Sequence, residues 1–287
     1  MMKQGDKVAI VCLSNGQKKT WQEKLELLTE TLREAGLIPV YGNYIFERED
    51  VFGAPAIKRA EELMDFYRNE EIKAIFDISG GDLANGILPH LDYELIVEQD
   101  KMFWGYSDLT TVINAIYQKT GKASVLYQIR NLIYAHKELQ KDMFQKALFE
   151  EGEALFSPEY AFVRGNEMQG IVLGGNIRCF LKLAGTQYMP NMKGKILLLE
   201  GYSGTVAKME TYLCQLEQIG VFEQVTGIIL GTFTEMEKEN CIPDMVTLVK
   251  RKVPKEIPIA VTREIGHGTD SKAILIGGAI HWKKEGV

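Results

Sequence analysis

The stretch "FWGYSDLT" places a serine between a strand-like run and a helix-like one. Gly105 permits a tight turn two residues before Ser107, and apolar residues at helical spacing begin at Leu109. Such a turn exposes a hydroxyl at the carboxyl end of a parallel strand, beside the first free N–H groups of a helix. Ser107 is therefore a candidate nucleophile, although Leu109 stands where the nucleophile-elbow pattern has its second glycine. The alternative is that Ser107 and Asp108 only cap the helix.

A second glycine-rich segment, "DISGGDLANG", ends another strand-like run at the pair Gly80 and Gly81. Glycines let backbone amides approach a ligand closely, and an oxyanion hole needs two N–H donors that converge on one oxygen. By itself, the pair is equally compatible with a phosphate-binding loop or a plain turn.

A nucleophilic serine needs a base, and histidine is the usual one near neutral pH. His267 lies between two glycines in "TREIGHGTDSK", just after a strand-like run, where an imidazole could reach across a cleft. The other histidines are in less suitable places: a polar helix face, a capping or surface position, and the last strand (His136, His90 and His281). We therefore expect His267 to be the base.

A catalytic histidine needs a carboxylate that holds its tautomer. Glu200 ends the apolar run "GKILLLEG" and therefore lies at the mouth of a buried strand. It could orient His267, or it could be an ordinary strand-end carboxylate that faces solvent. The chain order Ser, Glu, His would be that of the α/β-hydrolases.

The elements that must position these residues alternate between strands and helices. In the first half, "KVAIVCL", "IPVYGNY", "IKAIFDISGG", "KMFWGYS" and "ASVLYQI" alternate with amphipathic helical segments. This pattern predicts an α/β fold with an open, mostly parallel sheet in an N-terminal domain, residues 1–155. A polar, turn-rich segment follows, and glycine-bounded strands then predict a smaller β/α domain, residues 166–287. The serine would lie in the first domain, and the glutamate and histidine in the second.

The composition is that of a soluble globular protein: of 287 residues, 46% are hydrophobic and 25% charged, with a net charge of −6. No basic stripe indicates a nucleic-acid partner, and the longest apolar runs are too short to span a membrane. The opening segment fits a first strand better than a secretion signal, so we expect a cytoplasmic protein. The four cysteines show no C-x-x-C spacing, which favours free thiols over disulfides or a metal site.

Several motifs together resemble those of one enzyme family. "GGDLANGILPHLDYELI", "FWGYSDLTTVINAIYQKTG", "VLGGNIRCFLKLAGTQYMPNMKGKILLLEG" and "GHG" occur in the order found in the LD-carboxypeptidase family of serine peptidases, which includes the microcin self-immunity peptidases. The resemblance implies a triad of Ser107, Glu200 and His267, and an oxyanion hole formed by the backbone amides of Gly81 and Asp108. It also implies a flavodoxin-like N-terminal domain, a swivelling C-terminal domain, a homodimer, and no metal or organic cofactor.

The activity implied is that of a carboxypeptidase that cleaves an L,D-peptide bond in murein-type tetrapeptides during peptidoglycan recycling. One alternative is cleavage of peptidyl- or acylaminoacyl-nucleotides, and another is a homologue that binds ligand without catalysis. Arg130 could bind the terminal carboxylate of a small peptide-like substrate, or it could be a solvated surface residue. Asn176 could bind the substrate backbone or cap the next helix. Gly201 and Gly268 differ from the residues common in the family, which leaves the substrate more open than the chemistry.

Overall fold

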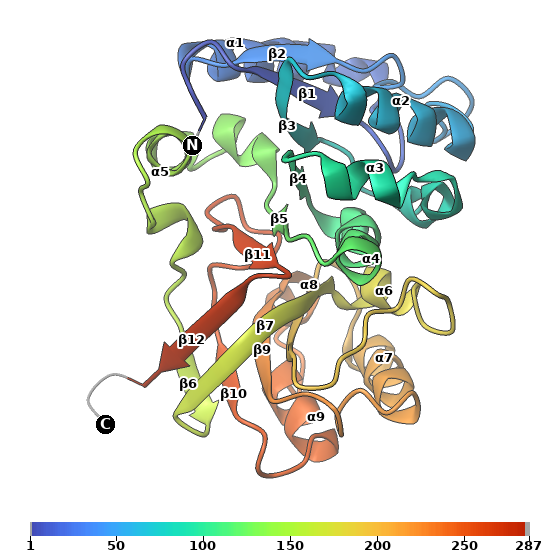
Figure 1. Cartoon of the computed structure of the whole chain (residues 1–287). Coiled ribbons are helices and arrows are strands. Elements are labelled where there is room, and N and C mark those ends of the chain that lie inside the picture. Colours follow the sequence, from blue (N-terminus) through green and yellow to red (C-terminus); the bar gives the residue numbers. More distant parts are fainter. Residues whose placement is uncertain (1, 285–287) are drawn as a thin grey trace.

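The computed structural model describes residues 2–284 and contains two six-stranded sheets (Figure 1). The first sheet has the strand order β11-β5-β4-β3-β1-β2, and all its pairs are parallel except β11 with β5. Its strands are β1 (Lys7–Val11), β2 (Ile38–Tyr41), β3 (Ile72–Asp77), β4 (Met102–Gly105), β5 (Ser124–Leu126) and β11 (Ile274–Ile276).

Helices cover both faces of this sheet, which explains why its central strands are apolar throughout. Along β1, Val8 and Ile10 pack in the same cluster as Leu28 of α1, whereas Ala9 and Val11 pack on the other face. The helices of this half are α1 (Gln22–Glu34), α2 (Ala56–Arg68), α3 (Tyr93–Glu98), α4 (Thr110–Thr120) and α5 (Lys137–Phe149). Short 3-10 helices lie between these elements: η1 (Lys19–Trp21), η2 (Ala84–His90), η3 (Ser107–Leu109), η4 (Ile129–Ile133) and η5 (Ala154–Phe156).

The second sheet has the order β12-β7-β8-β9-β10-β6, with four parallel strands in the middle and an antiparallel strand at each edge. Its strands are β6 (Ala161–Arg164), β7 (Glu167–Asn176), β8 (Ile196–Gly201), β9 (Gly227–Phe233), β10 (Ile259–Val261) and β12 (Ala279–Lys283). Its helices are α6 (Ile177–Leu181), α7 (Val206–Gln218), α8 (Thr234–Lys238) and α9 (Met245–Lys252). The predicted fold class, a mostly parallel α/β domain followed by a second β/α domain, is therefore confirmed.

The two halves are joined closely. One buried cluster contains side chains from both sheets, among them Leu126 of β5 and Leu173 of β7. The chain also returns to its first sheet near its end, because β11 pairs with β5 (Figure 1). The first sheet is thus completed by a segment from the part of the chain that was predicted to form the second domain.

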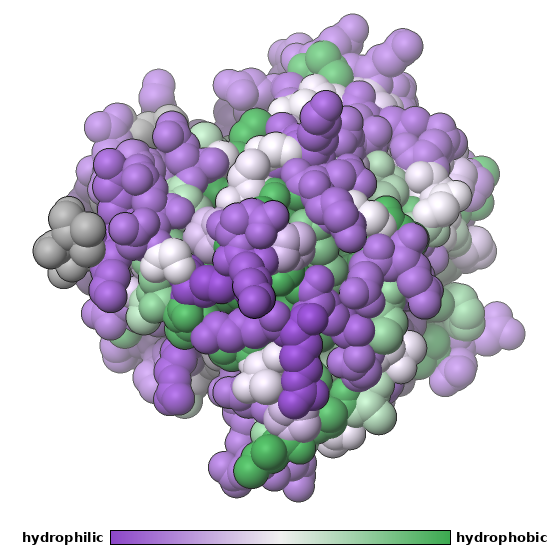
Figure 2. Space-filling model, turned by 90° about the horizontal axis from the view of Figure 1, so that it is seen from below, coloured by the Kyte–Doolittle hydropathy of each residue, from purple (hydrophilic) through white to green (hydrophobic). Residues whose placement is uncertain are grey.

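Hydrophilic residues dominate the outer surface that Figure 2 shows from below, and hydrophobic residues are visible mainly in a hollow near its middle. Within residues 2–284, no helix is both long and apolar enough to span a bilayer.

Candidate active site

Ser107 lies directly after β4, at the start of η3, with a positive φ of 53°. This left-handed conformation is strained for a residue other than glycine, and such strain is concentrated at functional sites. The N-cap positions of η3 and α4 are Tyr106 and Leu109, so Ser107 does not cap either helix. Gly105 makes the turn possible, because a Cβ there would lie 2.7 Å from the Cβ of Leu109.

The hydroxyl of Ser107 instead contacts a histidine from the other domain. Oγ of Ser107 lies 3.2 Å from Nε2 of His267, and Nδ1 of His267 lies 2.7 Å from Oε2 of Glu200. Ser107 and His267 follow β4 and β10, whereas Glu200 lies at the carboxyl end of β8. These strands belong to two different sheets. The three residues singled out by their sequence context are thus brought together in one hydrogen-bonded chain.

Glu200 is completely buried at the end of β8. One of its oxygens binds His267, and within the described part of the chain the other, Oε1, is buried without a hydrogen-bond partner. Gly231 leaves room for it, since a Cβ there would lie 3.1 Å from the Cβ of Glu200. A buried carboxylate needs a compensating partner, and Nδ1 of His267 is the group that contacts Glu200.

Two tyrosine rings enclose the imidazole. The ring centroids of Tyr106 and Tyr202 lie 4.5 Å and 4.9 Å from that of His267. Tyr106 is buried, and burial raises the pKa of its phenol well above the usual value, helped by the negative charge of Glu200. Tyr202 is 60% exposed. The histidine is therefore fixed from the protein side by Tyr106, and Tyr202 presents an aromatic surface at the entrance to the site.

The Gly80–Gly81 loop runs beside the serine. A Cβ at Gly80 would lie 3.9 Å from Oγ of Ser107, and the carbonyl of Gly80 accepts a hydrogen bond from the amide of Asn15 at 3.2 Å. In a trans peptide the following N–H points the opposite way, so this bond sets the direction of the Gly81 amide. Oδ1 of Asn15 also accepts from the amide of Asp82 at 2.9 Å. Gly81 itself has a φ of 122°, and a Cβ there would overlap the side chain of Asn15.

The buried carboxylate of Asp77, at the end of β3, holds the start of this loop. Oδ2 of Asp77 accepts from the amide of Leu13 at 2.7 Å, and Oδ1 accepts from the amide and the hydroxyl of Ser79 at 2.6 Å and 2.5 Å. Burial raises the pKa of Asp77 to about 6, and these hydrogen bonds oppose that shift. The hydroxyl of Ser79 in turn accepts from the amide of Ser14 at 2.9 Å. The loops after β1 and β3 are therefore tied to each other.

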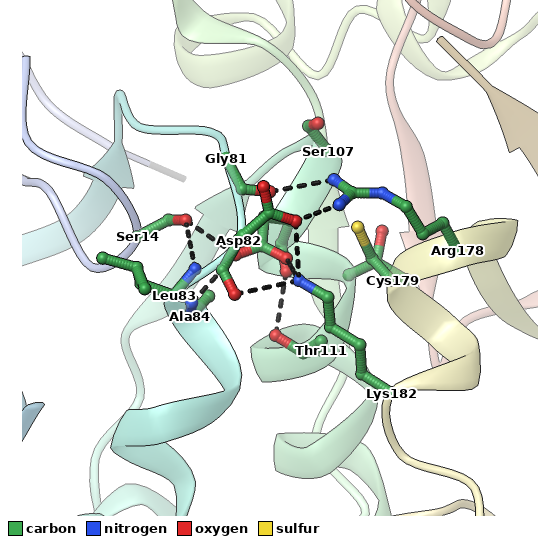
Figure 3. A network of polar contacts seen from close by, with 12 residues as sticks. Ser14, Gly81, Asp82, Leu83, Ala84, Ser107, Thr111, Arg178, Cys179 and Lys182 are labelled. Atoms are coloured by element: carbon green, nitrogen blue, oxygen red, sulfur yellow. Dashed lines mark hydrogen bonds and ion pairs between the residues drawn. The ribbon is translucent and has the colours of Figure 1, made fainter. Parts of the chain in front are cut away.

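Asp108, directly after the serine, is also completely buried. Its Oδ2 accepts from the hydroxyl of Ser14 at 2.6 Å and from the amide of Ala84 at 2.8 Å, and its Oδ1 accepts from Nζ of Lys182 at 2.5 Å (Figure 3). Its side chain thus ties the serine turn to the loop after β1, to η2 and to the second domain. Ser14, Asn15, Asp77 and Lys182 were not predicted from the sequence. The signal available for the first three was their position at or just after the ends of β1 and β3 in a parallel sheet.

The two predicted substrate-binding residues already have contacts within the protein. The guanidinium of Arg130 lies 5.5 Å from the ring centroid of Trp21 and donates to Gln128 at 3.0 Å. Asn176 is the N-cap of α6, where its Oδ1 accepts from the amide of Cys179 at 3.3 Å. The side chain of Asn176 therefore caps α6, as one of the two interpretations expected. Substrate binding by Arg130 and Asn176 remains a prediction.

The other three histidines lie outside this arrangement. His136 contacts Thr269 at 2.8 Å, His281 on β12 pairs with Glu167 at 2.6 Å, and His90 is exposed at the end of η2. All four cysteines are free thiols. Across residues 2–284, no group of three or more histidine, cysteine or acidic side chains could hold a metal ion.

A separate cavity of about 820 Å³ lies in the second domain. Its lining comes from β6, β9, β10 and the helices α8 and α9, and includes none of the residues Ser107, Glu200 and His267. The chemistry described above is therefore not located in this cavity.

Comparisons with known proteins identify two family domains in this chain. Residues 8–127 match the LD-carboxypeptidase N-terminal domain, and residues 169–281 match the LD-carboxypeptidase C-terminal domain. A Bacillus subtilis protein named "Probable murein peptide carboxypeptidase" is 28% identical over 96% of this chain and 88% of its own length.

Two solved structures share the fold. The MccF-like protein from Bacillus anthracis has a TM-score of 0.86 and 28% identity, over 99% of this chain and 95% of its own. The muramoyltetrapeptide carboxypeptidase from Oxalobacter formigenes has a TM-score of 0.79 and 21% identity, over 97% and 95% of the two chains.

Proposed function

The chain belongs to the LD-carboxypeptidase family, and from that premise we propose that it is a serine carboxypeptidase that hydrolyses an L,D-peptide bond of murein-type tetrapeptides. Family membership supports a peptidase. The observation that carries the serine mechanism is the chain of hydrogen bonds from Ser107 through His267 to Glu200, at 3.2 Å and 2.7 Å. A homologue that only binds ligand would not need these three groups, which come from two domains, to form one chain of hydrogen bonds.

In the proposed mechanism, Nε2 of His267 takes the proton of Ser107 as its oxygen attacks the scissile carbonyl. Glu200 stabilises the imidazolium and keeps its orientation. The imidazolium then gives the proton to the leaving nitrogen, the C–N bond breaks, and an acyl ester remains on Ser107. Water, deprotonated by His267, attacks this ester and releases the acid, and the serine recovers its proton.

The negative oxygen of each tetrahedral intermediate needs donors that are already in place. We assign the backbone amides of Gly81 and Asp108 to this role, since the first lies in the loop beside Oγ of Ser107 and the second directly follows it. One such donor is typically worth about 3–4 kcal/mol of transition-state stabilisation.

The family and the named murein peptide relative support this substrate class. Removal of terminal D-alanine requires recognition of a free carboxylate, for which Arg130 is the candidate, and Asn176 is the candidate for the substrate backbone. An enzyme of peptidoglycan recycling would work in the cytoplasm, and we expect a homodimer that needs no cofactor.

A second candidate is hydrolysis of peptidyl- or acylaminoacyl-nucleotides. Two observations favour it: the similarity to the MccF-like structure over 99% of this chain, and the exposed ring of Tyr202, 4.9 Å from that of His267. An aromatic ring at the entrance could stack on a nucleotide base, because base–aromatic stacking is worth about 1–3 kcal/mol.

Both candidates are tested by one substrate panel. The purified protein is given a murein L,D-tetrapeptide and an aminoacyl-nucleotide conjugate in parallel, and released D-alanine or free nucleotide is measured. We expect the tetrapeptide to be cleaved faster, and Ser107→Ala to remove activity while circular dichroism stays unchanged. Equal turnover by Ser107→Ala would dismiss the nucleophile, and faster cleavage of the nucleotide conjugate would select the second candidate.

A further inference from the structure

Two cations of the second domain, Arg178 on α6 and Lys182 at the C-cap of this helix, reach into the first domain beside the proposed oxyanion hole. Lys182 and Arg178 are four residues apart, so their side chains leave the same side of one helical turn. Figure 3 shows both side chains extending from α6 toward the segment that contains Gly81 and Asp82. Their partners are the two backbone segments that would supply the oxyanion-hole donors.

Lys182 holds the segment that contains the nucleophile. Its Nζ lies 2.5 Å from Oδ1 of Asp108, a carboxylate with no exposed surface. The remaining oxygen of Asp108 is already occupied by Ser14 and Ala84, so Lys182 is the cation that compensates this buried charge. Because the amide of Asp108 is a proposed donor, the ion pair fixes the residue whose N–H must point at the reacting oxygen.

Arg178 holds the other segment. Its Nη2 donates to the carbonyl of Gly81 at 2.9 Å, and its Nη1 contacts the carboxylate of Asp82. Lys182 adds a hydrogen bond from Nζ to the carbonyl of Asp82 at 3.0 Å. On the opposite side, Asn15 binds the same loop through the carbonyl of Gly80 and the amide of Asp82. The loop is therefore held from both sides, with one side supplied by the second domain.

From these contacts we infer that Lys182 and Arg178 are positioning residues that align the two oxyanion-hole amides. The inference rests on the proposed function, because it assigns a purpose to the same site. Both cations already have carboxylate partners within the protein: Arg178 pairs with Asp82, and Lys182 pairs with Asp108 and, at 3.5 Å, with Asp82. The second domain would then supply both the base and the alignment of the donors, and a complete site forms only when the domains are docked.

The test compares Lys182→Met and Arg178→Met with matched controls in the same domain. Lys252 pairs with Glu210 and Glu217 at 2.9 Å and 3.3 Å and is similarly buried, but both of these partners lie on α7 and neither is a residue of the site. The second control, Arg164, donates to the backbone carbonyls of Ile257 and Val253, as Arg178 does to that of Gly81.

Two rates are measured for each variant: kcat and KM on the murein tetrapeptide, and the rate at which a fluorophosphonate labels Ser107. In the labelling step the serine oxygen bonds to phosphorus and fluoride leaves, and the phosphoryl oxygen occupies the oxyanion hole. We expect Lys182→Met and Arg178→Met to lower kcat and the labelling rate about 10- to 100-fold, with KM changed less than twofold. Lys252→Met and Arg164→Met are expected to stay within twofold of the unmodified protein.

Lys182→Met leaves Asp108 buried without its cation and could unfold the protein, so a double variant is included. Asp108→Asn combined with Lys182→Met has no unpaired charge and should regain the melting temperature but not the rates. Recovery of both rates would show that Lys182 only neutralises Asp108, and would overturn the inference. The inference would also be overturned if Lys182→Met and Arg178→Met had the same kcat and labelling rate as the control variants.

These outcomes differ from failure of the proposed function. If the unmodified protein is neither labelled nor active, the serine mechanism fails and the inference falls with it. If the unmodified protein is labelled and active while the Lys182 and Arg178 variants match their controls, only the inference fails.

Discussion

The side chain of Asn114 binds both backbone groups of Gly174 across the domain joint. Its Nδ2 donates to the carbonyl at 2.8 Å, and its Oδ1 accepts from the amide at 2.9 Å. Asn114 is buried on α4, the helix that follows Ser107 and η3, and Gly174 lies on β7. Since one planar group satisfies both bonds, it fixes how the nucleophile helix meets the second sheet, and so helps to set the distance between Ser107 and His267.

We expect Asn114→Asp to disrupt the pair of hydrogen bonds between α4 and β7. The change puts a carboxylate oxygen against the carbonyl of Gly174 and buries an unpaired charge, so we expect a loss of about 3 kcal/mol in the free energy of unfolding. Urea denaturation measures it, with the exposed Asn166→Asp as the control, expected within about 0.5 kcal/mol of the unmodified protein. Equal stability of both variants would contradict a structural role for this contact.

Glu200→Gln should remove most of the activity without disturbing the fold. A glutamine that donates toward Nδ1 of His267 would force the proton onto Nε2, where the ring can no longer accept the proton of Ser107. The expected loss in kcat is about 10³- to 10⁴-fold. Steady-state kinetics check it, and Glu210→Gln, which removes the charge of a carboxylate paired with Lys252, should keep full activity. A loss below tenfold would mean that Glu200 does not orient the base.

The energetic cost of the strained backbone at Ser107 can be measured by comparing the stability of two variants that lack the hydroxyl. At a φ of 53°, glycine avoids the clash that a Cβ causes, so Ser107→Gly should be more stable than Ser107→Ala by about 1 kcal/mol. At the exposed Ser157, where φ is −112°, the same pair should show the opposite order or no difference. Chemical denaturation of the four variants gives the comparison, and the prediction fails if Ser107→Ala is as stable as Ser107→Gly.

The raised pKa of Asp77 predicts a dependence of stability on pH. The carboxyl of Asp77 has a pKa of about 6 in the folded protein and an ordinary value of 3.8, so between these pH values the folded protein keeps a proton that the unfolded chain has released. The free energy of unfolding contributed by this group therefore falls as the pH rises through that window, by up to roughly 1.4 kcal/mol per pH unit.

Asp77→Asn lacks this contribution. We expect the difference in the free energy of unfolding between the unmodified protein and Asp77→Asn to decline from pH 4 to about pH 6 and then to level off. The contributions of the carboxylates that both proteins share cancel in this difference. Urea denaturation at several pH values measures the difference. A difference that stays flat or rises with pH would contradict the expected direction.

Much of the fold could be predicted because its signals are local. Apolar runs bounded by glycines mark the strands, and helical spacing after Ser107 marks α4. The same local signals placed Ser107, Glu200 and His267 at strand ends, and the structure brings them together. Local sequence could not decide whether Ser107 caps a helix, because a capping serine and a strained nucleophile have similar neighbours; the backbone conformation decides it.

The remaining features depend on partners far away in the chain. Asn114 and Asp108 look like ordinary residues at the start of a helix, and their roles follow only from Gly174 and Lys182, which no spacing connects to them. Likewise, the short run Ile274–Ile276 gives no sign that it pairs antiparallel with β5. The lysine on α6 could equally have been a solvated charge, as most lysines are.

The return of β11 to the first sheet affects how the protein is made. While a ribosome is still synthesising the C-terminal half, β5 has an open edge, with backbone groups that only a distant and late segment can satisfy. Completion of the sheet that ends next to Ser107 thus waits until residues 274–276 have emerged. A shortened product that stops before Ile274 would leave the edge of β5 unpaired and open to association with other chains.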